Sequence, residues 1–270
     1  MKLHHQQIIA SDEADTHTLF FLHGIFGMGK NWASIAKALI RRKPELDGQL
    51  IDLRLHGQSL DFAEPHTLET TAQDLDQLLP LTRDKPFAIL GHSFGGKVAM
   101  QYALKNPHAN LKALYIVDST PDAYPPSGSA WQMIDIIKGL ASEFESRQQV
   151  TDLLEGAGLH RGVAMWMASN IISVGDHYTW RFDIRYLQRL IEDFFATDLW
   201  ELVRCPPSGM EIHFIKAEHA NVLKESACQK ILALEQVHGR VHLHRIDAGH
   251  WVHVDNPKGL LNILEQNICF

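Results

Sequence analysis

Gly91-His92-Ser93-Phe94-Gly95 is the stretch of sequence that decides the fold. The apolar run at 86–90 before it is short and bounded by Pro and Gly, which is typical of a buried strand. The run at 96–105 after it predicts a helix. A strand-to-helix turn this tight leaves almost no room for side chains, which explains the glycines at 91, 95 and 96. The turn would raise the Ser93 hydroxyl above the sheet, beside the amide groups of a helix N-terminus.

The same alternation of strand and helix patterns continues on both sides of this turn. It predicts an α/β fold with a mostly parallel central sheet flanked by helices on both faces. The expected strands are at 18–22, 49–53, 86–90, 111–118, 211–215 and 241–246. The expected helices are at 31–40, 67–79, 96–105, 223–237 and 258–268.

Between 121 and 207 the alternation stops. This segment shows helical patterns without a convincing buried strand, and prolines punctuate both of its ends. An interruption of this length is too long for a loop. We therefore expect a helical cap at 121–207, inserted into a core formed by 1–120 and 208–270.

The overall composition is that of an ordinary globular protein. The 270 residues are 45% hydrophobic and 21% charged, and the formal net charge is −7. This charge excludes a nucleic-acid partner, because no basic stretch would neutralise a phosphate backbone. No apolar run approaches the roughly 18 residues of a membrane span, and the N-terminus lacks the apolar region of a signal peptide. The three scattered cysteines predict neither disulfides nor a zinc site, so we expect a cytoplasmic protein.

Histidine is abundant, with 17 residues in the chain. His242 and His244 would share one face of a strand, and His250 and His253 lie nearby in the sequence. No carboxylate or cysteine completes a ligand set at a familiar spacing. The sequence therefore predicts no metal site and no cofactor.

Three more motifs accompany the turn at 91–95. His23-Gly24-Ile25-Phe26-Gly27 follows an early strand, the segment 52–59 is similar to a D-x-R-x-H-G-x-S signature, and Gly249-His250-Trp251 follows the last strand. Together these motifs resemble the α/β-hydrolase superfamily across nearly the whole chain. The segments 23–27 with Asn31-Trp32, 91–97 and 249–253 resemble most closely the small YbfF-type bacterial esterases. The resemblance implies the α/β-hydrolase fold.

The resemblance also implies roles for individual residues. Acyl transfer needs a nucleophile, a base, a group that orients the base, and donors for the oxyanion. In this superfamily the chain order is serine, acid, histidine, which makes Ser93 the nucleophile and His250 the base. The backbone amides of Ile25 and Phe94 would form the oxyanion hole.

The orienting acid departs from the common pattern. In most of these enzymes it follows the strand after the cap, in a stretch resembling G-x-x-D, but here Ala220 stands where the aspartate is expected. Asp118 ends the strand after the nucleophile helix and should lie at the same sheet edge as Ser93. In the YbfF-type group the acid is thought to follow that helix, which favours Asp118. The other interpretation is that Asp118 caps a turn, and Glu218 is then the reserve acid.

These assignments predict a serine hydrolase that cleaves carboxylic esters or thioesters of short to medium acyl chains through an acyl-enzyme intermediate. Its partner would be a small-molecule ester or thioester. Two alternatives are a C–C hydrolase or lyase on the same fold, and a ligand receptor that retains the triad. The first alternative needs cationic groups in the pocket, for which the cap offers Arg147, Arg161, Arg181, Arg185 and Arg189.

Apolar cap residues are the candidates for the acyl-binding surface. One interpretation is that these residues face the pocket, and the other is that they only pack against one another within the cap. They are Trp131, Met133, Ile134, Ile137, Met165, Trp166 and Met167.

Overall fold

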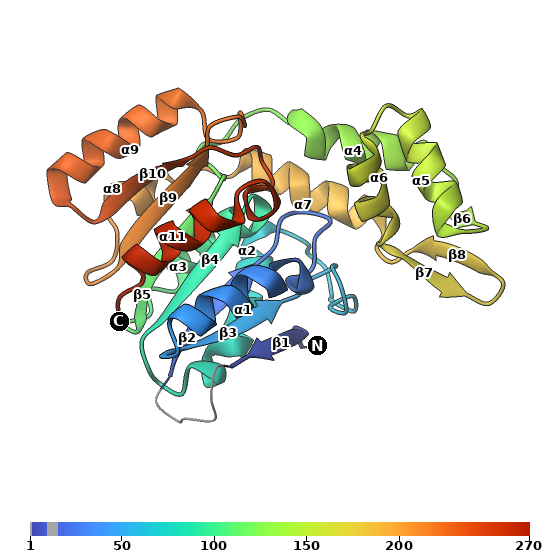
Figure 1. Cartoon of the computed structure of the whole chain (residues 1–270). Coiled ribbons are helices and arrows are strands. Elements are labelled where there is room, and N and C mark those ends of the chain that lie inside the picture. The colour runs from blue at the N-terminus through green and yellow to red at the C-terminus, as the bar shows by residue number, and fades with distance from the viewer. Residues whose placement is uncertain (1, 10–15) are drawn as a thin grey trace.

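A seven-stranded sheet forms the centre of the protein in a computed structural model that describes residues 2–9 and 16–270 (Figure 1). The strand order is β1-β3-β2-β4-β5-β9-β10. Among the described residues every pairing in this sheet is parallel except that of β1 with β3. The bounds are β1 (His5–Ile8), β2 (His17–Leu22), β3 (Leu46–Ile51), β4 (Phe87–His92), β5 (Leu111–Val117), β9 (Glu211–Ala217) and β10 (Val241–Ile246). The predicted α/β-hydrolase fold is therefore confirmed.

Helices cover both faces of this sheet. On the face toward the viewer in Figure 1, α1 (Ala33–Arg42) and α11 (Pro257–Asn267) bury their apolar residues against β2, β4 and β5. On the opposite face α2 (Leu68–Gln73), α3 (Phe94–Lys105) and α9 (Glu225–His238) contribute to the other core cluster. The helix predicted at 67–79 is shorter than expected, because a 3₁₀ helix (Asp74–Thr82) that contains Pro80 replaces its second half. A 3₁₀ helix (Gly29–Trp32) and the short α10 (Val252–Asp255) lie near the carboxyl ends of the strands.

The segment 121–207 is mainly helical but also contains a small sheet. Its helices are α4 (Gly128–Lys138), α5 (Arg147–Gly156), α6 (Arg161–Ala168), α7 (Ile184–Ala196) and α8 (Trp200–Arg204). The strands β6 (Glu143–Phe144), β7 (Ile171–Val174) and β8 (His177–Trp180) form an antiparallel sheet that the sequence did not predict. These strands are short and partly exposed, so they lack the apolar run of a buried strand. In Figure 1, α4, α5, α6 and the small sheet extend to one side, and α7 returns to the core.

None of the helices in the described part of the chain combines the length and the apolar character that crossing a bilayer requires.

Lys97 joins the two ends of the 121–207 segment to the helix that follows Ser93. Its ammonium group is buried and donates hydrogen bonds to the backbone carbonyls of Asp122 at 2.8 Å, Phe194 at 2.6 Å and Thr197 at 2.7 Å. Burial lowers the pKa of Lys97 to about 8, although nearby carboxylates including that of Asp122 oppose the shift. One side chain of α3 therefore fixes where the chain leaves the core and where it returns.

We predict that Lys97→Met destabilises the protein by about 3 kcal/mol, because three buried carbonyl groups lose their donor. Urea unfolding followed by tryptophan fluorescence measures the effect. Lys105→Met, at the exposed end of the same helix, is the matched control and should change the free energy of unfolding by less than about 0.5 kcal/mol. Equal unfolding midpoints for the two variants would show that Lys97 does not hold the segment.

Candidate active site

Ser93 lies at a sharp turn between β4 and α3, with backbone angles φ 51° and ψ −115°. Residues other than glycine rarely adopt this backbone conformation, because it is strained. Such strain persists only where the surrounding structure holds the residue in place. A Cβ atom on Gly91 would lie 2.2 Å from the carbonyl oxygen of Gly95, so only glycine allows the strand and the helix to approach this closely. The Ser93 amide donates to the carbonyl of Val117 on the neighbouring strand at 3.0 Å. The turn therefore presents the Ser93 side chain at the carboxyl edge of the sheet.

His250 and Asp118 meet at this edge. The distance from His250 Nδ1 to Asp118 Oδ2 is 2.6 Å, and the Asp118 carboxylate is fully buried. The other carboxylate oxygen accepts a hydrogen bond from the Ala217 amide at 3.3 Å. With its Nδ1 proton directed at Asp118, His250 keeps Nε2 available as a proton acceptor. Ser93 and His250 line the same cavity.

Glu218, the reserve acid, lies elsewhere on this side of the sheet. Its carboxylate accepts a hydrogen bond from Arg245 Nη1 at 3.2 Å, and both side chains are more than one third exposed. The structure thus brings Asp118, and not Glu218, to the His250 ring.

His92 has a role that the sequence analysis missed. Its Nε2 lies 2.8 Å from the backbone carbonyl oxygen of His250. Burial, together with the neighbouring His250 and His253, holds the pKa of His92 well below its usual value, so the neutral ring donates this hydrogen bond. The residue before Ser93 therefore holds the loop that carries His250. A histidine inside the G-x-S-x-G motif was the only sequence signal for this contact.

The loop at 23–27 lies beside Ser93, and His23, Gly24 and Ile25 line the cavity. Phe94 is the first residue of α3, and its side chain is buried. Among the residues that the structure describes, no hydrogen bond uses the amide of Ile25 or Phe94 as its donor. Both amides therefore have no acceptor among the described residues.

His56 holds this loop in place from the segment after β3. Its Nδ1 lies 2.8 Å from the carbonyl oxygen of Arg54, and its Nε2 lies 3.2 Å from the Phe26 amide. The amide must donate, so Nε2 is the acceptor and the ring is neutral with its proton on Nδ1. Burial lowers the pKa of His56 to about 3, in agreement with a neutral ring.

His23 joins the same two segments, this time with its ring on the loop at 23–27. Its Nδ1 donates to the carbonyl of Gly24 at 2.7 Å, and its Nε2 accepts from the Leu53 amide at 3.0 Å. Burial lowers its pKa to about 4. Two neutral histidines therefore join the loop at 23–27 to the segment at 53–56.

The D-x-R-x-H-G-x-S signature at 52–59 is a network of buried polar contacts. Asp52 accepts hydrogen bonds from the Gly29 amide at 2.7 Å and the Gln58 amide at 2.9 Å. Gly57 has φ 55°, and a Cβ atom there would lie 2.2 Å from the Asp52 carboxylate. The signature residues thus fix the shape of the loop that carries His56.

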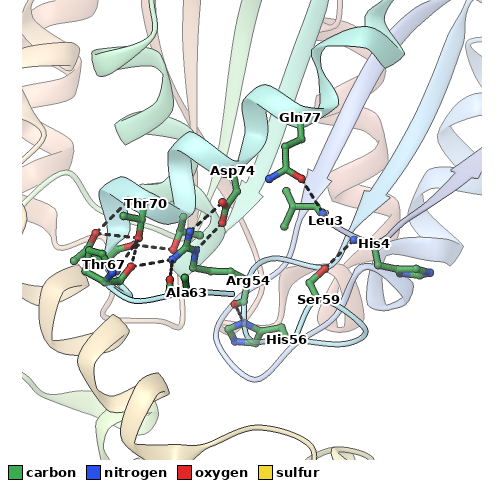
Figure 2. Close-up of polar contacts among 12 residues, drawn as sticks. Leu3, His4, Arg54, His56, Ser59, Ala63, Thr67, Thr70, Asp74 and Gln77 are labelled. Atoms are coloured by element: carbon green, nitrogen blue, oxygen red, sulfur yellow. Dashed lines mark hydrogen bonds and ion pairs between the residues drawn. The ribbon is translucent and has the colours of Figure 1, made fainter. Parts of the chain in front are cut away.

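Figure 2 shows how Arg54 and Ser59 connect this loop to the rest of the core. Arg54 forms a buried bidentate pair with Asp74, at 2.6 Å from Nε and 3.0 Å from Nη2, and also donates to the Pro65 carbonyl at 2.9 Å. The Ser59 hydroxyl accepts from the His4 amide at 2.8 Å. The signature therefore supports the site without contacting the cavity.

The cavity beside Ser93 has a volume of about 190 Å³ and a mainly apolar lining. Of the seven apolar residues of the 121–207 segment considered above, Met133 and Trp166 line it. Met165 is 56% exposed, and the others are absent from the lining. The 121–207 segment also lines the cavity with five residues that the sequence did not single out: Ser129, Ala130, Gln132, Leu159 and Val163. The ring of Trp166 packs edge to face against that of Trp251, the residue after His250, with the ring centroids 4.4 Å apart.

None of the five arginines of the 121–207 segment, all of which the structure describes, lines this cavity. Their hydrogen-bond acceptors are the Ala168 carbonyl for Arg147, Glu155 for Arg161, the Gly57 carbonyl for Arg181, Asp183 for Arg185 and Glu64 for Arg189. These contacts hold the guanidinium groups outside the lining of the cavity.

Comparison with known proteins agrees with this geometry. A family model described as "Alpha/beta hydrolase family" matches residues 19–263, so the chain belongs to the α/β-hydrolase family. It is 27% identical over 260 residues to the mouse sn-1-specific diacylglycerol lipase ABHD11, covering 93% of this chain and 80% of the relative. It is also 27% identical over 272 residues to the zebrafish protein of the same name, covering 96% of this chain and 79% of that relative.

A solved structure titled "Marine microorganism esterase" superimposes with a TM-score of 0.83 at 24% identity, covering 99% of both chains. These relatives have lipase and esterase names and not specifically that of the YbfF-type esterases. The comparisons therefore confirm the predicted superfamily and identify a hydrolase family with lipase and esterase members.

The buried histidines His23 and His56 predict how the free energy of unfolding depends on pH. Their pKa values are below the value of about 6.5 expected in the unfolded chain. Below pH 6.5 the unfolded state therefore binds more protons, and stability falls as the pH decreases toward 4. We predict that His56→Gln, which removes one such group, reduces this slope by about 1.4 kcal/mol per pH unit.

Urea unfolding at pH 7, 6 and 5 measures the slope. The control is His219→Gln, because the His219 side chain is 67% exposed, and it should keep the wild-type slope. Identical slopes for all three proteins would contradict a buried neutral His56.

Proposed function

We propose that this protein is a cofactor-free serine hydrolase that cleaves carboxylic esters or thioesters through an acyl-enzyme intermediate on Ser93. The observation that carries the proposal is the 2.6 Å contact between His250 and the buried Asp118, next to Ser93 on one cavity. In this scheme 121–207 is a cap over that cavity, contributing α4 and α6 to its lining.

In the first step, His250 Nε2 takes the Ser93 proton while Ser93 Oγ attacks the carbonyl carbon of the substrate. The amides of Ile25 and Phe94 donate to the oxyanion, and the loss of one such donor costs about 3–4 kcal/mol in the transition state. Asp118 stabilises the imidazolium that forms. His250 then gives its proton to the leaving alcohol or thiol.

In the second step, water attacks the acyl-enzyme. His250 takes a proton from the water, the second oxyanion forms between the same two amides, and the acid product leaves as Ser93 recovers its proton. No other group has to supply electrons or protons, so the reaction needs no cofactor.

The chemistry of the cavity supports an ester or thioester with a short to medium apolar acyl chain. Met133 and Trp166 provide apolar surface, and methionine adapts to acyl groups of different shape. The lipase and esterase names of the relatives agree with ester cleavage. The motifs shared with the YbfF-type esterases favour the same assignment. The C–C hydrolase or lyase alternative has less support, because the cap arginines do not reach the cavity.

We predict that Asp118→Asn lowers turnover of a nitrophenyl ester by about three to four orders of magnitude, because His250 loses the carboxylate that fixes its tautomer. Glu218→Gln should change turnover by about tenfold or less, since its carboxylate pairs with Arg245. Both changes preserve side-chain size, and circular dichroism checks that the variants are folded. The reversed order of effects would assign the acid to Glu218, and near-normal turnover in both variants would disprove the triad.

We predict that turnover of nitrophenyl esters is highest for short to medium acyl chains and declines for long ones, because the cavity is small and apolar. A parallel series of acyl-CoA thioesters compares the two leaving groups, and Ser93→Ala provides the background rate. Turnover that rises steadily with the polarity of the acyl group would contradict this assignment of the cavity.

A further inference from the structure

A second group of histidines and carboxylates lies away from the Ser93 cavity. Glu211 and His213 come from the start of β9, and His242 and His244 from the start of β10. Glu235 of α9 lies beside them. Ser93 follows the carboxyl end of β4, whereas this group lies near the amino ends of β9 and β10. Because these strands are parallel, Ser93 and the group lie at opposite ends of the strands. We call these five residues the β9–β10 cluster.

Three side chains of the cluster converge at one point. Glu211 Oε2 lies 3.2 Å from His213 Nε2 and 4.0 Å from His242 Nε2, and one ligand atom from each residue lies within 4.8 Å of the others. Around a tetrahedral zinc ion the ligand atoms are roughly 3.4 Å apart, given metal–ligand distances near 2.1 Å. His213 and His242 are direct partners in the β9–β10 register, so strand pairing fixes their backbones for this geometry.

Each of these two histidines also has a partner on its second ring nitrogen. His242 Nδ1 lies 3.1 Å from Glu235 Oε1, and His213 Nδ1 lies 3.1 Å from His244 Nε2. Metal-binding histidines almost always hold their second nitrogen in this way, which fixes the ring and its tautomer. The cluster therefore contains both the ligand atoms and the groups that orient them.

The burial of the cluster suits an ion that enters from solvent. The His213 side chain is 3% exposed, whereas those of His242 and Glu211 are 25% and 53% exposed. The buried ring of His213 and the exposed carboxylate of Glu211 would hold the ion at the boundary between the core and solvent.

We propose that Glu211, His213 and His242 bind a divalent ion of the zinc class, with Glu235 and His244 orienting the two imidazoles. Two imidazole nitrogens and one carboxylate form a ligand set that such ions accept, and water would complete it. The ion would join β10, the edge strand, to β9, and would lie outside the proposed hydrolase reaction. The sequence analysis missed this set because Glu211 and His213 reach His242 only through strand pairing.

Zinc titration of the whole protein tests the proposal. Isothermal calorimetry, with metal content measured by mass spectrometry after dialysis, should give one zinc ion per chain. His242→Ala and Glu211→Gln should weaken this binding at least tenfold. The control is His177→Ala, which removes a histidine on the β7–β8 hairpin and should bind zinc like the wild type. Zinc should raise the Tm of the wild type and of the control, and should not raise that of the two ligand variants.

Nuclear magnetic resonance of the histidine side chains provides a second readout. Without zinc, His213 should hold its proton on Nε2, facing Glu211. With zinc, the proton should move to Nδ1 and be donated to His244. Absence of zinc binding, equal binding by the wild type and His242→Ala, or an unchanged His213 tautomer would each overturn the proposal. Ester turnover by His242→Ala should match the wild type, which keeps this test separate from that of the proposed function.

Discussion

The backbone of Ser93 is the constraint on which the rest of the site depends. A serine at φ 51° between a strand and a helix needs neighbours that hold it there. The glycine at 91 allows the close approach of β4 and α3, and the hydrogen bond to the Val117 carbonyl ties the turn to β5. Asp118 directly follows the same strand, so the residues that fix the serine also place the carboxylate that contacts His250.

Neutral, buried histidines are the second feature on which the site depends. His23, His56 and His92 are buried, and each uses its ring as a rigid hydrogen-bonding group that positions backbone. Protonation would replace an acceptor of His23 or His56 with a second donor facing an amide. Protonation of either ring would therefore weaken the contacts that join the loop at 23–27 to the segment at 53–56. Of the histidines near Ser93, His250 is the one whose ring contacts a buried carboxylate, as a proton-transferring base requires.

The sequence was most informative where a pattern is local. The apolar runs predict the strands around Ser93, and the order of strands predicts that Asp118 reaches the edge where Ser93 lies. β1 was missed because His5–Ile8 is short, polar and only partly buried, and it lacks the signal of a core strand. The small sheet of β6, β7 and β8 was missed for the same reason.

The remaining features depend on contacts between distant segments. The sequence pattern does not distinguish Lys97 from an ordinary helix residue. Only the fold brings the Phe194 carbonyl of α7 to its ammonium group. Helical periodicity places Met133 and Met165 on apolar helices, but only packing decides that the first lines the cavity and the second is exposed. Likewise, only the register of β9 and β10 places Glu211 beside His242.

The central claim is that the turn between β4 and α3 presents Ser93 as an activated nucleophile. Labelling of the intact protein with a fluorophosphonate, followed by mass spectrometry of its peptides, tests this claim most directly. The account predicts one covalent adduct per chain, on Ser93. An adduct on a different serine, or no adduct on the folded protein, would contradict it.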